Sequence, residues 1–151
     1  NPIIYAKALC DKEVISETTG YNFKGGTYSG TNVKNCNSNE TILLDANKTT
    51  YEKVTFEGCP SNGQNNWLKF NVGATISFNV SKACKLNICF YKGKNNAIVK
   101  LGDTEISTST DSTGAGDMTK YEYTITGEGL VTISAASNGG YIGYFEVVME
   151  A

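Results

Sequence analysis

The sequence predicts an all-β protein, an antiparallel β-sandwich or jelly roll. Apolar residues alternate with polar ones from residue 51 onward, and turn signals recur about every ten residues. No heptad and no apolar stripe of helical period is present. Sixteen Gly against two Pro, with nine Tyr and abundant Thr, Ser and Asn, suit short strands joined by polar turns. Regularly spaced strands of this kind are typical of antiparallel sandwiches and barrels.

The N-terminal third of the chain gives weaker signals than the rest. Residues 5–9 are the best candidate for a helical turn. Residues 21–28 predict a strand, a tight turn at Gly25-Gly26 and a second strand, while residues 41–44 predict another strand. The stretch 32–39 between them is predicted to be a polar loop.

The remaining strands follow from strict alternation, which leaves each strand one buried face. Val72 and Tyr141 fall on the buried side together with their apolar neighbours, and residues 110–117 are predicted to be a loop of small residues. No linker or internal repeat is visible, so residues 1–151 are predicted to form a single domain. The expected strands are 51–56, 67–72, 75–80, 84–91, 96–101, 105–107, 121–125, 131–135 and 141–147.

Composition removes several classes of function. The chain has no His, which excludes Ser-His-Asp and Cys-His catalysis and His-ligated metals. All thirteen basic residues are Lys, so bidentate Arg clamps are absent, and the net charge of -2 disfavours a nucleic-acid partner. No apolar run is long enough to span a bilayer, so no membrane partner is expected.

The five cysteines leave at least one thiol unpaired within the chain. They form no Cys-X-X-Cys pair, so the sequence does not support a zinc ribbon or a thioredoxin-like site. Cys36 and Cys59 lie in polar, turn-rich surroundings and could form a disulfide; alternatively all five thiols are reduced. The chain begins at Asn1, which suggests a mature or excised module whose targeting segment lies upstream.

Alternation also identifies the residues that point away from the core. Lys92 and Lys94 flank a turn next to Tyr91, and several lysines on neighbouring strands would form one positive face. Such a face would favour an acidic polymer, whereas solvated lysines would only keep the strands soluble. The predicted outward set is Tyr51, Lys53, Trp67, Lys69, Lys85, Asn87, Tyr91 and Lys100.

Trp67 has two interpretations. It is the only Trp of the chain and alternates with Leu68 and Phe70, so it falls on the polar side of its strand. An exposed Trp67 would be a platform for a sugar ring, with nearby Lys, Asn and Tyr groups bonding its hydroxyls. The alternative is a Trp67 buried under a loop or beneath a cover on that side of the sandwich.

The carboxylates give no clear catalytic pair and no metal motif. Asp103 with Glu105, and Asp111 with Asp117, are the local pairs, but nothing marks either pair as buried in a cleft. A glycosidase needs two carboxyls about 5–10 Å apart, one with a raised pKa. No cofactor is predicted with certainty; a structural calcium ion is compatible with such a sandwich, although no EF-hand spacing is present.

Residues 67–80, from Trp67 to Val80, resemble a pattern found in non-catalytic carbohydrate-binding modules of secreted enzymes that degrade plant cell walls. The runs 83–86, 121–127 and 131–133 are similar too, and residues 140–147 are like the last strand of such modules. The resemblance covers about residues 66–149. Many of these modules have an Asp in the last strand where this chain has Gly143.

The resemblance implies a secreted, monomeric, non-catalytic module that binds a polysaccharide and is linked to a catalytic or scaffold domain. Pectin binders of this kind use lysines to meet galacturonate, while binders of neutral glucan and mannan depend more on Trp and Tyr. An adhesin or structural β-sandwich that binds protein is the alternative. A small glycan-cleaving enzyme is the third possibility, which the missing His disfavours.

Overall fold

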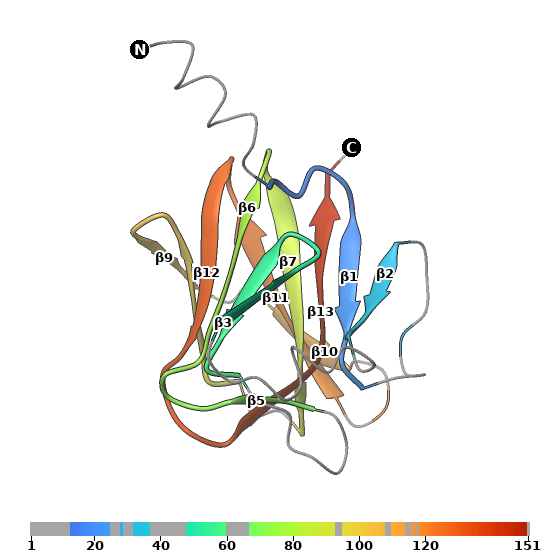
Figure 1. Ribbon diagram of the computed structural model, residues 1–151, viewed down its shortest axis with the longest axis vertical. Helices are drawn as coiled ribbons and strands as arrows, with labels where there is room; N and C mark the ends of the chain where they lie inside the picture. Colours follow the sequence, from blue (N-terminus) through green and yellow to red (C-terminus); the bar gives the residue numbers. More distant parts are fainter. Residues whose placement is uncertain are drawn as a thin grey trace.

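The computed structural model describes residues 13–24, 28, 32–36, 48–59, 67–92, 95–107, 110–113, 116 and 118–150. Two β-sheets pack face to face in this part of the chain, so the predicted all-β sandwich is confirmed (Figure 1). The helical turn expected at 5–9, the Gly25-Gly26 turn and the strand expected at 41–44 lie outside the described residues.

The first sheet has seven strands. β7 and β13 form its centre, and β5 pairs with Gly140–Ile142 of β13 on the side opposite β7. All pairings are antiparallel except that of β1 with β2. In the order β10-β11-β7-β13-β1-β2, followed by β5, the strands are Thr110–Thr113, Met118–Ile125, Cys84–Tyr91, Gly140–Met149, Thr19–Asn22, Val33–Asn35 and Leu68–Phe70.

The second sheet has six strands, all paired antiparallel. In Figure 1 it lies on the left and in front, with β13, β1 and β2 of the first sheet on the right. In the order β3-β4-β6-β12-β8-β9 the strands are Lys48–Tyr51, Val54–Glu57, Thr75–Val80, Gly129–Ala135, Ala97–Leu101 and Thr104–Ile106.

The inner faces of the two sheets form the main core. On β7 the inward residues Leu86, Ile88 and Phe90 are fully buried, and on β6 the inward Ile76 and Phe78 meet them from the other sheet. The alternation therefore predicted the inner faces correctly wherever a strand runs without interruption. A segment before β1 also contributes, because Ile15 is buried and bridges to Val80 of β6.

The strand predicted from residue 51 to residue 56 is wrong at its start. β3 ends at Tyr51 and β4 begins at Val54, with Glu52 and Lys53 forming a two-residue turn whose φ angles are 50° and 73°. Tyr51 and Val54 are cross-strand partners and so share a face. Tyr51 packs against the main core, and its predicted outward position is therefore a misassignment.

Three other predictions of local structure are corrected. Val72 is 63% exposed because β5 ends at Phe70 and the chain turns, with the Ala74 N–H bonding the Asn71 carbonyl. Residues 110–113 form β10, although a loop was expected there, and β2 lies within the stretch predicted to be polar loop. Both strands are short and mostly polar, so they lack the apolar alternation that marks the other strands. They are defined by their pairing, β10 with β11 and β2 with β1.

A β-bulge interrupts β13. The register shifts between Ile142 and Tyr144, so Gly143 is an extra residue opposite β7. Ile142 therefore faces the main core, whereas Tyr141 lies on the opposite side, contrary to the predicted alternation of 141–147. The carbonyl of Gly143 accepts hydrogen bonds from the backbone N–H groups of Phe23 and Lys24, which fixes the chain after β1 beside the bulge.

Candidate functional site on the outer face of the seven-stranded sheet

The outer face of the seven-stranded sheet carries a second cluster of buried side chains, which we name the aromatic face. Strand pairing places Tyr91 opposite Met118, and Cys89 opposite Tyr144. Four of its members are buried and four others pack against them partly exposed. The buried residues are Trp67, Cys89, Met118 and Tyr144, and the partly buried ones are Tyr28, Val33, Tyr91 and Tyr141.

Trp67 lies across the bulge of β13. A Cβ atom at Gly143 would overlap the Trp67 ring and the Met118 sulfur, so any larger residue here must displace these side chains. The Trp67 and Tyr91 ring centroids are 5.1 Å apart, with the ring planes tilted by 53°. Trp67 is on the outer side of its strand, as predicted, but it is only 5% exposed. Of the two interpretations of Trp67 the buried one is correct, and the exposed platform is excluded, because the residues of the aromatic face cover the ring.

Two lysine ammonium groups lie over the rings of this cluster. Lys24 Nζ is 5.0 Å from the Trp67 ring centroid, and Lys92 Nζ is 5.0 Å from that of Tyr91. A cation over an aromatic face is attracted by the negative quadrupole of the ring. The two ammonium groups thus lie over two neighbouring rings at one end of the aromatic face.

A polar group adjoins the cluster further along β7. Asn87 Nδ2 donates to Glu146 Oε1 at 2.9 Å, and the Tyr144 hydroxyl donates to Glu146 Oε2 at 2.9 Å. Tyr144 stacks on Tyr28, with centroids 3.7 Å apart and planes 10° apart. Burial raises the pKa of Tyr144, and the Glu146 carboxylate raises it further, so the hydroxyl remains a donor.

Cys89 shows how well water is excluded beneath these rings. Its thiol shares a hydrogen bond with the Tyr28 hydroxyl, with 3.0 Å between sulfur and oxygen, and it has no exposed surface. Burial raises the pKa of the thiol to about 11. Cys36, Cys59 and Cys84 are also buried and unbridged, so of the two alternatives the reduced one holds for the four described cysteines; Cys10 lies outside the described residues.

The structure brings most of the predicted binding residues to this one sheet. Lys69 is half-buried on β5 and pairs with Tyr141 of β13. Lys85 Nζ donates to Thr124 Oγ1 at 2.9 Å and lies 3.7 Å from Glu122, so its charge is already compensated. Asn87 lies on the outer side as expected but is only 6% exposed.

The other predicted residues lie elsewhere. Lys100 is on β8, opposite Thr132 and Glu105, on the outer face of the six-stranded sheet. Lys53 is at the tip of the β3–β4 turn. A single positive face that includes Lys53 and Lys100 is therefore wrong, because the outer faces of two packed sheets point in opposite directions. Lys94 lies outside the described residues.

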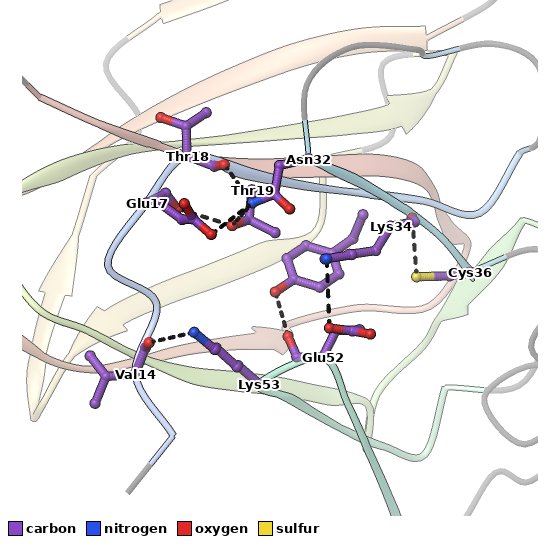
Figure 2. A network of polar contacts seen from close by, with 10 residues as sticks. Val14, Glu17, Thr18, Thr19, Asn32, Lys34, Cys36, Glu52 and Lys53 are labelled. Atoms are coloured by element: carbon purple, nitrogen blue, oxygen red, sulfur yellow. Dashed lines mark hydrogen bonds and ion pairs between the residues drawn. The ribbon is translucent and has the colours of Figure 1, made fainter. Parts of the chain in front are cut away.

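Lys53 belongs to a separate polar network, where the β3–β4 turn meets β1 and β2 (Figure 2). The Tyr21 hydroxyl donates to the Glu52 carbonyl at 2.6 Å, Lys34 lies 3.7 Å from Glu52, and Lys53 donates to the Val14 carbonyl at 3.2 Å. The network borders a pocket of about 120 Å³ whose lining residues are Glu17, Thr19, Tyr21, Asn32, Lys34, Glu52 and Lys53.

Each charged side chain of this pocket has a partner within hydrogen-bond or ion-pair distance. Besides the lysine contacts, Glu17 accepts a long 3.5 Å bond from Asn32 Nδ2, which also donates to Thr19 Oγ1 at 3.0 Å. Asn32, like Glu52 and Lys53, has a positive φ, at 61°. Such backbone conformations cost about 1–3 kcal/mol per residue and persist only when neighbours hold them. The network therefore joins the two sheets at one edge of the sandwich.

One of the two local carboxylate pairs considered from the sequence lies within the described residues. Asp103 and Glu105 are both exposed, at the β8–β9 turn and on β9. The side chains of Asp111 and Asp117 lie outside the described part. No group of three or more Cys, Asp or Glu side chains among the described residues is arranged to hold a metal ion. No helix in that same part of the chain is long and apolar enough to cross a membrane.

Sequence reasoning missed Lys24, Tyr28, Tyr144 and Glu146. Glu146 lies between the inward residues Phe145 and Val147, so alternation applied to the last strand would have placed it outward. Lys24 and Tyr28 have no such signal: the backbone bonds to Gly143 place Lys24, and the Tyr28 carbonyl accepts a bond from Asn22 Nδ2 at 3.2 Å.

Comparison with known proteins adds no family to this picture. No family model matches the chain, and no curated protein resembles it closely enough in sequence to count as a relative.

Proposed function

We propose that this chain is a non-catalytic module that binds polysaccharide on its aromatic face and tethers a linked, secreted enzyme to plant cell-wall glycan. The observation that carries the proposal is the pair of ammonium groups, Lys24 and Lys92, held 5.0 Å over the adjacent rings of Trp67 and Tyr91. Carbohydrate sites combine apolar ring surfaces with a few directional polar groups. Tethering raises the local substrate concentration of a linked catalytic domain.

The lysines also favour one class of glycan. A neutral sugar that stacks on Tyr91 must displace Lys92 from the ring, whereas an acidic sugar can pair with the ammonium group where it is. Lys69, half-buried beside Tyr141 at the same end, adds a third positive charge. The ligand of this proposal is therefore an acidic polysaccharide such as homogalacturonan, with Tyr91 and Tyr141 as the accessible rings.

The same surroundings support binding without catalysis. Glycoside cleavage needs a carboxyl whose pKa is raised in a cleft, opposite a second carboxyl. Asp103 and Glu105, the described pair considered from the sequence, are exposed on the β8–β9 hairpin, away from the aromatic face. The resemblance in the C-terminal part of the chain points to the same non-catalytic class.

Affinity electrophoresis in gels that contain polygalacturonate tests the proposal. We expect the wild-type protein to be retarded, and Tyr91→Ala and Lys92→Ala each to weaken binding about tenfold, since stacking and charged hydrogen bonds each contribute about 1–3 kcal/mol. Lys100→Ala, on the opposite face, is the matched control and should bind like wild type.

Salt gives a second measurement. Raising NaCl from 0.1 M to 1 M shortens the Debye length from about 10 Å to about 3 Å, which should weaken binding to polygalacturonate but not to neutral glucan. A folded wild-type protein that no polysaccharide retards would refute the proposal and leave the protein-binding adhesin or structural module as the better reading. Retardation that Tyr91→Ala and Lys92→Ala leave unchanged would place the site elsewhere.

A further inference from the structure

The Glu146 carboxylate is held in place by hydrogen bonds to both of its oxygens. Its two oxygens are held separately, one by Asn87 and one by Tyr144, each at 2.9 Å. Tyr144 is held in turn by its stack on Tyr28. Its hydroxyl lies directly over Gly20, where the Cβ atom of any other residue would overlap it. Two carboxylate oxygens offer about four acceptor sites, so about two remain for other donors.

Asn87 adds an unused acceptor next to this carboxylate. The side chain is only 6% exposed, and its Oδ1 atom has no hydrogen-bond partner among the described residues. A buried polar atom without a partner is costly to the folded protein, and such atoms are rare. Asn87 lies directly between Glu122 and Glu146 in a row across β11, β7 and β13. A hydroxyl donor that arrives over this row meets the Glu146 carboxylate directly, and it reaches Asn87 Oδ1, which has almost no exposed surface, once the covering side chains move.

The charge of this row differs from that of the lysine end. Glu122 is paired with Lys85 at 3.7 Å, so Lys85 compensates Glu122 and leaves Glu146 as the fixed negative group. Asn87 and Tyr91 are four residues apart on β7, which corresponds to about 13 Å at 3.3–3.4 Å per residue. A single sugar cannot cover both ends, and a sugar carboxylate placed at Glu146 would be repelled.

We propose that Asn87 and Glu146 form a second subsite that accepts hydrogen bonds from sugar hydroxyls, about 13 Å along β7 from the lysine-capped rings. This inference rests on the proposed function. The ligand is then a stretch of acidic polysaccharide several sugars long. One of its acid groups lies at Lys24 and Lys92, and hydroxyls, not a carboxylate, lie at Glu146. The subsite sets a minimum length and a direction for the bound chain.

The test is isothermal titration with galacturonic acid and its linear oligomers of increasing length. Wild-type affinity should rise with length until the oligomer reaches the second subsite. Glu146→Gln keeps the size of the side chain but removes its charge. It should weaken binding of the long oligomers about tenfold, the value of one hydrogen bond to a charged group, and leave the shortest ligands unchanged. Lys92→Ala should weaken all lengths alike.

Two further variants guard against a purely structural effect. Tyr144→Phe keeps the ring stacked on Tyr28 but removes the hydroxyl that positions Glu146, so it should also act on the long oligomers only. Lys100→Ala, on the outer face of the other sheet, is the control and should bind all lengths like wild type. Thermal melting shows whether each variant is folded.

The outcomes separate the two proposals. If Glu146→Gln and Tyr144→Phe bind long oligomers as wild type does, or weaken short and long ligands equally, the second subsite is refuted while the proposed function stands. If the folded wild-type protein binds no oligomer and no polymer, the proposed function fails and the subsite fails with it.

Discussion

The two outer faces of the sandwich have the same alternating construction but very different surroundings. On the six-stranded sheet, cross-strand pairing lines up Thr50, Thr55, Ser77 and Thr132 in one row of hydroxyl-bearing residues, none of them buried. On the seven-stranded sheet the corresponding face carries Trp67, Cys89, Met118 and Tyr144, all buried. Alternation thus determines which side of a sheet a residue takes, but not whether that side remains open to water.

The difference arises from side chains that cover the outer face of the seven-stranded sheet. Tyr28 stacks on Tyr144, and Trp67 lies over Gly143, so residues distant in the sequence cover the strands. The six-stranded sheet has a hollow of about 310 Å³ on its outer side, lined by residues that include Thr50, Thr55, Ser77 and Leu130. One face therefore behaves as a small second core, and the other as an ordinary solvated sheet surface.

The largest expected effect follows from removing the Trp67 ring. Trp67→Ala should lower the free energy of unfolding by about 3–5 kcal/mol, since it leaves a cavity among Cys89, Met118 and Tyr144. Urea denaturation followed by circular dichroism measures this loss. A variant as stable as wild type would mean that the aromatic face is not a core at all, and that the contrast between the two outer faces is false.

The next effect tests the close approach at the bulge of β13. Gly143→Ala should destabilise the protein by about 1–3 kcal/mol because its Cβ would overlap Trp67 and Met118. Gly127→Ala is the matched control, since nothing lies within 4 Å of a Cβ atom at that position. Equal denaturation midpoints for the two variants would show that Trp67 moves aside at no cost.

The pKa values of two buried thiols allow the burial of the aromatic face to be compared with that of the main core. Burial raises the pKa of Cys89, on the aromatic face, and of Cys84, in the main core, from 9.0 to about 11 each. The native state keeps these protons to higher pH than the unfolded chain does. Their contribution to stability is therefore full below pH 9 and decreases as the pH rises through about 11.

This predicted loss of stability at high pH is tested by denaturation midpoints measured from pH 8 upward for wild type, Cys89→Ala and Cys84→Ala. Each variant should lose stability less steeply above pH 9 than wild type does, and by similar amounts. If the pH dependence of stability becomes less steep in Cys84→Ala but not in Cys89→Ala, water reaches Cys89 and the aromatic face is less dry than the main core.

The smallest effect is expected on the open face. Thr132→Val replaces a hydroxyl by a methyl group in the row of the six-stranded sheet and keeps the β-branched shape. It should change the free energy of unfolding by no more than about 0.5 kcal/mol. A loss as large as that of Gly143→Ala would mean that the hydroxyl row is itself a structural element, which would weaken the contrast between the faces.

Part of the candidate site was predictable from the sequence. Tyr91, Lys85 and Asn87 lie on the outer side of β7, as alternation with Leu86, Ile88 and Phe90 requires. Lys53 and Lys100 were grouped with them because alternation describes each strand separately. It cannot say which strands become neighbours, and the pairing places β4 and β8 in the other sheet.

By itself, the sequence determined the fold class, most strands and the residues of the main core, because a period of two is a local property that each strand shows on its own. Tertiary structure alone decided the turn at Glu52-Lys53, the bulge at Gly143 and the burial of Trp67. Each of these depends on contacts between segments far apart in the chain. A one-residue shift in register, or a loop laid over a strand, changes which side chains meet water without altering the alternating pattern.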